Sequence, residues 1–173
     1  MKRSVRKLTR AAVAAALYAV LTVLLAPISY GPLQLRLSEA LMLLPYFMPE
    51  TAAGLVVGCF IVNTAGGYGV ADMVFGTLAT ALTVYTIVFC GKKGGRFAVF
   101  VTILAPAVYN GVLVGAVLAY MTIEGGAFFT AYLVYAGQIA LSELLIMTII
   151  GLPAMRYLPK SRLFALINEK EKL

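Results

Sequence analysis

Residues 31–50 read GPLQLRLSEALMLLPYFMPE and place two full charges, Arg36 and Glu39, three positions apart in an otherwise apolar segment. A charged side chain that faces lipid near the bilayer centre costs about 3 kcal/mol or more. Such charges therefore face a polar cavity, pair with another charge, or lie near the membrane surface. The surrounding sequence bears on which of these applies here.

The whole chain is apolar enough to require a membrane. Of its 173 residues, 62% are hydrophobic and 12% are charged, and the mean hydropathy is +0.95. A soluble domain of this length has too much surface for its size to hide so many apolar side chains from water. The sequence therefore predicts an all-α integral membrane protein, embedded in the lipid bilayer, with residues 1–173 forming one domain.

Thirteen of the fourteen basic residues fall in three clusters, within residues 2–10, 92–96 and 156–172, and Arg36 is the exception. Basic residues that flank apolar segments mark cytoplasmic ends. A nucleic-acid-binding surface is the rival interpretation of basic clusters. Here the clusters lie at the ends of apolar spans, so no nucleic acid partner is expected. A cleaved signal peptide is the rival interpretation for the first cluster, although the apolar run over 11–25 is long for one.

If all three basic clusters are cytoplasmic, an even number of spans separates each from the next. Proline- and glycine-rich breaks divide the intervening segments, and the count reaches six transmembrane helices with both termini cytoplasmic. The second and third are short for a hydrocarbon core of about 30 Å, so they are tilted, buried or partly re-entrant. A four-helix protein with two re-entrant loops is the alternative. The predicted spans are 11–29, 35–48, 51–66, 71–90, 97–121 and 128–155.

The strongly polar residues of these spans gather in the half of the membrane opposite the basic clusters. Ionisable groups at that depth face a cavity or one another, so the pattern predicts a pocket open to the outside. Three acids against one arginine favour a cation, or a ring with hydrogen-bond donors along its edge. The candidate binding residues are Arg36, Glu39, Asn63, Asp72, Asn110, Gln138 and Glu143, with Tyr68 and Tyr109 as candidates to stack on a ring.

Structural roles compete with binding for several of these residues. Arg36 and Glu39 could form a self-neutralising pair near the interface that only anchors the segment. Asp72 could serve as a helix N-cap. Gln138 and Glu143 lie roughly 140° apart on an ideal helix, so both cannot face one ligand unless the helix bends.

Small residues recur at four-residue spacing and predict close helix packing. Ala11, Ala15 and Ala19 form such a stripe on the first predicted span, and Gly54 and Gly58 repeat the spacing on the third. Small side chains let helices approach each other closely in lipid. The alanine stripe could meet a partner subunit or an internal neighbour.

Several kinds of chemistry lack the residues that they need. Histidine is absent, and the two cysteines, Cys59 and Cys90, have no metal-binding or redox spacing. The sequence has no phosphate-binding loop, zinc-protease motif or serine-hydrolase elbow. We expect no catalytic residue, metal or cofactor, and no ATP hydrolysis by this chain alone. A small membrane enzyme using Asp72 and Glu143 as acid and base is a weaker alternative. A structural or assembly subunit is another.

Three stretches resemble a known family: YGPLQLRLSEALMLLPYFMPE, the run GLVVGCFIVNTAGGYGVADMVFGTLAT over 54–80, and the later PAVYNGVLVG. They cover about a third of the chain and resemble the QueT family of substrate-binding S-components of energy-coupling factor (ECF) transporters. An S-component for another vitamin or nucleobase-like micronutrient is the alternative, because one fold serves many cargoes.

The resemblance implies a carrier for a queuosine precursor, a 7-deazaguanine such as the aminomethyl form or queuine. It implies an S-component-like bundle in a bacterial plasma membrane, working with two ATPase subunits and a transmembrane coupling protein. By analogy, the stripe of Ala11, Ala15 and Ala19 would meet that coupling protein. The residues matched to the family do not say which side chains contact the cargo.

Overall fold

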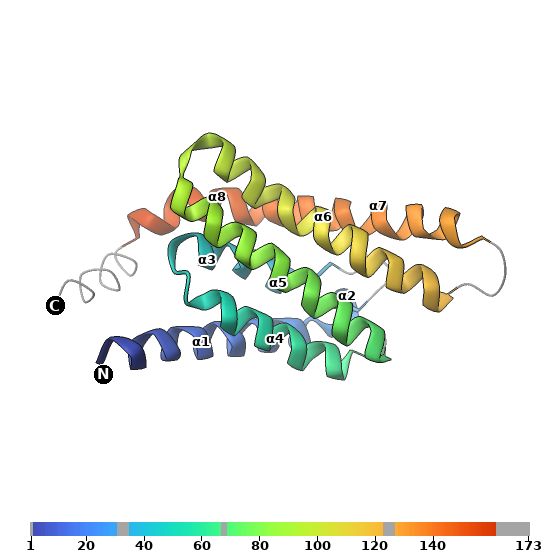
Figure 1. Cartoon of the computed structure of the whole chain (residues 1–173), viewed down its shortest axis with the longest axis horizontal. Helices are drawn as coiled ribbons and strands as arrows, with labels where there is room; N and C mark the ends of the chain where they lie inside the picture. Colours follow the sequence, from blue (N-terminus) through green and yellow to red (C-terminus); the bar gives the residue numbers. More distant parts are fainter. Residues whose placement is uncertain (1, 31–34, 67–68, 123–126, 162–173) are drawn as a thin grey trace.

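The computed structural model describes residues 2–30, 35–66, 69–122 and 127–161, and every long element in these ranges is a helix. The helices lie side by side along the longest axis of the molecule, and the chain reverses direction at each connection (Figure 1). The long helices are α1 (Lys2–Leu24), α4 (Thr51–Ala65), α5 (Gly69–Lys93), α6 (Gly95–Thr122) and α7 (Phe128–Ile146).

Four helical segments are long and apolar enough to cross a membrane, and two apolar helical segments are shorter. The long segments run over Ser4–Leu24, Gly69–Lys93, Gly95–Thr122 and Phe128–Lys160; the shorter ones over Leu37–Phe47 and Thr51–Ala65. The prediction of an all-helical, membrane-compatible chain is confirmed in this coarser form. Six crossings with cytoplasmic termini remain a prediction.

The second predicted span differs most from an ordinary helix. After the short α2 (Ala26–Ser29), the 3₁₀ helix η1 covers Leu37–Leu43 and the α-helix α3 covers Leu44–Phe47. A 3₁₀ helix rises about 2.0 Å per residue instead of 1.5 Å, so residues 35–48 reach roughly 27 Å. This stretched geometry lets a short segment run most of the length of the bundle.

Glycine lets α1 and α4 pack closely. A Cβ atom added to Gly54 would collide with the backbone of Ala11, and one added to Gly58 would lie 2.8 Å from the carbonyl oxygen of Ala15. The stripe of Ala11 and Ala15 therefore faces α4, and Ala12 is exposed on another side of α1. The sequence allowed this stripe to meet either a partner subunit or another helix of the same chain. In the structure, Ala11 and Ala15 meet a helix of the same chain, α4.

The last predicted span is interrupted near its end. Residues Met147–Gly151 form a π-helical turn, followed by α8 (Leu152–Tyr157) and the 3₁₀ helix η3 (Leu158–Lys160). A Cβ on Gly151 would lie 3.0 Å from a methyl group of Leu43, so this turn packs directly against η1. A π-helical turn is often found near functional sites, and here it supports the segment that carries Arg36 and Glu39.

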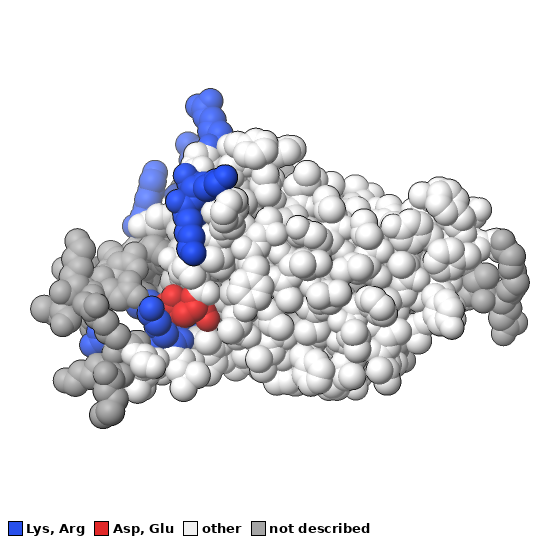
Figure 2. Space-filling view, viewed as in Figure 1, with Lys and Arg blue, Asp and Glu red and all other residues white. Residues whose placement is uncertain are grey.

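Charged side chains gather at one end of the bundle. Figure 2 shows lysine and arginine side chains, with an acidic group beside them, at the end where α1 begins and α5 meets α6; the described surface beyond that end is uncharged in this view. We call this the basic end; its residues include Arg10 on α1, Lys92 and Lys93 on α5, and Arg156 on α8. The α5–α6 turn at this end needs glycine, because Gly94 and Gly95 adopt left-handed φ angles of 65° and 86°.

Candidate functional site

Six of the predicted binding residues are buried inside the bundle. They come from η1 or its N-cap and from α4, α5, α6 and α7. Their exposed fractions are 5% for Arg36, 1% for Glu39, 2% for Asn63, 0% for Asp72, 5% for Asn110 and 4% for Glu143.

Arg36 belongs to a first group that lies toward the end opposite the basic end. Its Nη1 donates a hydrogen bond to Oδ1 of Asn63 at 3.1 Å, and its Nη2 lies 3.8 Å from Oδ2 of Asp72. Asn63 in turn donates to the backbone carbonyl of Asp72 at 3.4 Å. The guanidinium also lies over the Tyr30 ring, 5.6 Å from its centroid. We call Arg36, Asn63 and Asp72 the arginine layer.

Local backbone geometry separates Arg36 from Glu39 in depth. Arg36 is the extended N-cap of η1, with φ −88° and ψ 95°. A 3₁₀ helix has three residues per turn, so Glu39 follows on the same side about 6 Å further along. The ion partner of Arg36 is Asp72 on α5. The N-cap role that the sequence allowed for Asp72 is wrong, because α5 begins at Gly69 and Asp72 lies inside its first turn.

Glu39 and Glu143 form the second group, which we call the acid pair. Tyr18 of α1 donates a hydrogen bond to Oε1 of Glu39 at 2.6 Å, and Asn110 of α6 donates to Oε1 of Glu143 at 2.8 Å. The segments that carry the two acids, η1 and α7, pack against each other. Each carboxyl group is therefore held by a neighbouring helix, Glu39 by α1 and Glu143 by α6.

Sequence reasoning missed the side chains that hold these groups from α1 and α4. Tyr18 is fully buried, and the hydroxyls of Thr22 and Ser38 share a hydrogen bond at 2.7 Å. Cys59 accepts hydrogen bonds from Thr80 at 3.1 Å and from the Asn63 amide at 3.3 Å. The position of Tyr18 in the sequence could have pointed to it. Tyrosines are enriched at membrane surfaces, whereas this one lies in the middle of a predicted span.

The two groups leave several buried polar atoms without hydrogen-bond partners among the residues that the structure describes. These include Nε of Arg36, Oε2 of Glu39, Oε2 of Glu143 and both carboxylate oxygens of Asp72. Native proteins rarely leave such atoms unsatisfied, because each one costs about 1–3 kcal/mol. The arrangement can therefore bind a polar ligand that brings both donors and acceptors.

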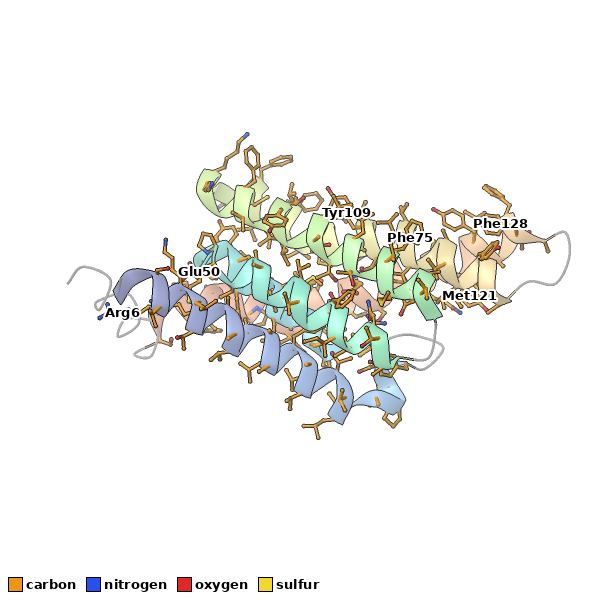
Figure 3. All side chains as sticks on the ribbon, turned by 60° about the horizontal axis from the view of Figure 1, so that its bottom comes forward. Arg6, Glu50, Phe75, Tyr109, Met121 and Phe128 are labelled. Atoms are coloured by element: carbon orange, nitrogen blue, oxygen red, sulfur yellow. The ribbon has the colours of Figure 1, made fainter. Side chains whose placement is uncertain are left out.

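Three predicted site residues are not joined to these groups. Gln138 is half-buried on α7, and no hydrogen bond of its side chain is recorded in the described ranges. Tyr109 bonds through its hydroxyl to Thr86 at 3.2 Å and lies at the edge of the bundle, where α5 and α6 meet (Figure 3). Tyr68 lies outside the described residues. Within the described part of the chain, no group of three or more metal-binding side chains is found.

Comparisons with known proteins bear on this buried site. The model of the QueT transporter family matches residues 8–160. The queuosine precursor transporter QueT of Lactococcus lactis subsp. cremoris, strain MG1363, is 39% identical over 71 residues, which cover 40% of this chain and 41% of that protein. No solved structure matches the chain.

Proposed function

Because this chain belongs to the QueT transporter family, we propose that it captures a queuosine precursor outside the cell for uptake, as the S-component of an ECF-type importer. The observation that carries the proposal is the pair of buried polar groups with unsatisfied atoms, in a family whose members are transporters. The relative from Lactococcus lactis is named for a queuosine precursor, which gives the substrate class that we propose here.

The proposed topology has six crossings of a bacterial plasma membrane, with both termini in the cytoplasm. The gathering of basic side chains at one end supports it, because such residues favour the cytoplasmic side. The arginine layer then lies nearer the outer surface than the acid pair does. Cargo from outside reaches Arg36 first and Glu143 last.

The chemistry of a 7-deazaguanine suits these side chains. Its pyrimidine edge carries adjacent N–H donors that a carboxylate can accept in parallel, and its carbonyl oxygen needs a donor. Glu39, Glu143 and Asp72 supply acceptors, and Arg36 and the asparagine amides supply donors. Gln138, Tyr68 and Tyr109 remain candidate contacts from the sequence, without support from the described geometry.

The proposed partners are two ATPase subunits and a transmembrane coupling protein, which supply the energy for import. The sequence contains no phosphate-binding loop of its own. Ala11 and Ala15 pack against Gly54 and Gly58 of α4, so the exposed side of α1 that carries Ala12 is the better surface for the coupling protein. Ala19 is half-buried beside α4 as well.

Thermal unfolding of the purified chain with candidate ligands tests this function. A ligand present at 100 times its Kd stabilises the folded state by about 2.7 kcal/mol. We expect 7-aminomethyl-7-deazaguanine or queuine to raise the Tm, and biotin and riboflavin to leave it unchanged. A shift with biotin or riboflavin and none with any deazaguanine would show that the cargo is different.

A further inference from the structure

We propose that the acid pair Glu39 and Glu143 binds the ammonium group of a cationic 7-deazaguanine, and that the arginine layer does not contact this ammonium group. The inference rests on the proposed function and narrows it: the cargo carries a positively charged amine on its side chain. A neutral deazaguanine of the same size is then a poor ligand.

Each member of the acid pair has one oxygen engaged and one oxygen free. Tyr18 occupies Oε1 of Glu39, and Asn110 occupies Oε1 of Glu143, at 2.6 and 2.8 Å. Oε2 of each acid is buried without a hydrogen-bond partner in the described ranges. The acids come from different elements, η1 and α7, which pack against each other, so the fold brings the acids together.

The only buried basic side chain among the described residues is already committed elsewhere. Arg36 lies in the arginine layer, where it donates one hydrogen bond to the Asn63 carbonyl oxygen and forms an ion pair with the Asp72 carboxylate. No second cation is available within the described bundle to neutralise Glu39 and Glu143. Buried carboxyl groups need such a partner to stay charged, because an unpaired charge in a low-dielectric interior is strongly disfavoured.

An ammonium group fits this environment in number and direction of hydrogen bonds. It offers three N–H donors and no acceptor, and the two free carboxylate oxygens take two of them. The hydroxyl of Ser142, next to Glu143, is also buried and unpartnered in the described part of the chain and is a candidate for the third. A nitrile in the same place offers only an acceptor, so it would face carboxylate oxygens with no hydrogen bond between them.

The test compares two ligands of similar size on the full chain in lipid nanodiscs at pH 7. Isothermal titration with 7-aminomethyl-7-deazaguanine and with neutral 7-cyano-7-deazaguanine gives the charge preference. We expect the wild-type chain to bind the aminomethyl compound at least about 100-fold more tightly, since two charge-assisted hydrogen bonds are at stake. Glu143→Gln should reduce this preference at least about tenfold, because the amine loses a charge-assisted hydrogen bond that the nitrile cannot make.

Glu50→Gln is the matched control, because Glu50 is the acid that pairs with Arg10 at the basic end, away from both groups. It should keep the wild-type preference. Equal affinity of the wild type for both ligands would overturn the inference, as would an equal loss for both in Glu143→Gln. If neither compound binds the wild type, the proposed function itself fails. If Glu143→Gln does not fold, the wild-type preference and Glu39→Gln still decide the question.

Discussion

The close contact between α1 and α4 makes Gly54→Ala the most informative single substitution. The added Cβ would collide with the carbonyl oxygen of Ala11 and would lie 2.6 Å from its carbonyl carbon and 2.9 Å from its Cα. All three atoms belong to the backbone, so no side-chain rotation relieves the clash. Helix α1 must retreat by about 1 Å, and a gap of that size forfeits up to half of each van der Waals contact across the interface.

The expected cost is about 1–3 kcal/mol, the range for overpacking a well-packed interior. Tyr18 lies on the same helix, and its 2.6 Å hydrogen bond to Glu39 would lengthen beyond hydrogen-bonding range if α1 moved by 1 Å. We therefore expect Gly54→Ala to lower the Tm by at least about 2 °C. Ligand affinity should fall in the same variant.

Gly137→Ala is the matched control on α7. A Cβ there meets nothing within 4 Å, so the substitution carries only the intrinsic preference of a helix for alanine. Thermal unfolding of both variants in the same detergent measures the difference. If Gly54→Ala is as stable as Gly137→Ala, α1 and α4 are not packed as described, and the support of Glu39 by α1 is refuted with it.

Three further experiments test the support of Glu39, the ion pair at the basic end and the proposed topology. Tyr18→Phe removes the hydrogen bond to Glu39, and titration should show about tenfold weaker ligand binding; unchanged affinity would mean that α1 does not orient Glu39. Glu50→Gln weakens the partly exposed pair with Arg10, 2.6 Å long, and should change the unfolding free energy by less than about 1 kcal/mol; a larger loss in thermal unfolding would contradict this. A membrane-impermeant maleimide should label Arg96→Cys from the cytoplasm and Ala127→Cys from outside. The native Cys59 and Cys90, 0% and 5% exposed, should stay unlabelled, and the reverse pattern would invert the proposed topology.

Much of the site could be predicted from the sequence because polar residues are rare in this chain. Glu39, Asn63, Asp72, Asn110 and Glu143 stand out against apolar neighbours, and the cost of exposing such groups to lipid leaves few alternatives to burial. The structure places all of them in two adjoining groups. The family resemblance was also correct, and the match over residues 8–160 confirms it.

Other features could not be predicted, because they depend on which neighbour a helix face meets. The 3₁₀ helix of η1 has the apolar composition of an α-helix, and only its packing among five neighbouring elements distinguishes it. Arg36 pairs with Asp72 rather than with Glu39, and predicting this requires knowing how α5 is aligned along η1. In the sequence, nothing separates Tyr18 from the apolar residues of α1. Its role depends on Glu39, which lies beside it only in the folded chain.

A structure of the chain bound to 7-aminomethyl-7-deazaguanine would show which side chains hold its amine. We expect the ligand inside the bundle, with its amine nitrogen about 3 Å from Oε2 of Glu39 and from Oε2 of Glu143. Ligand density in the apolar groove between α5 and α6, lined by Phe75, Leu113 and Tyr120, with the acid pair untouched, would contradict it.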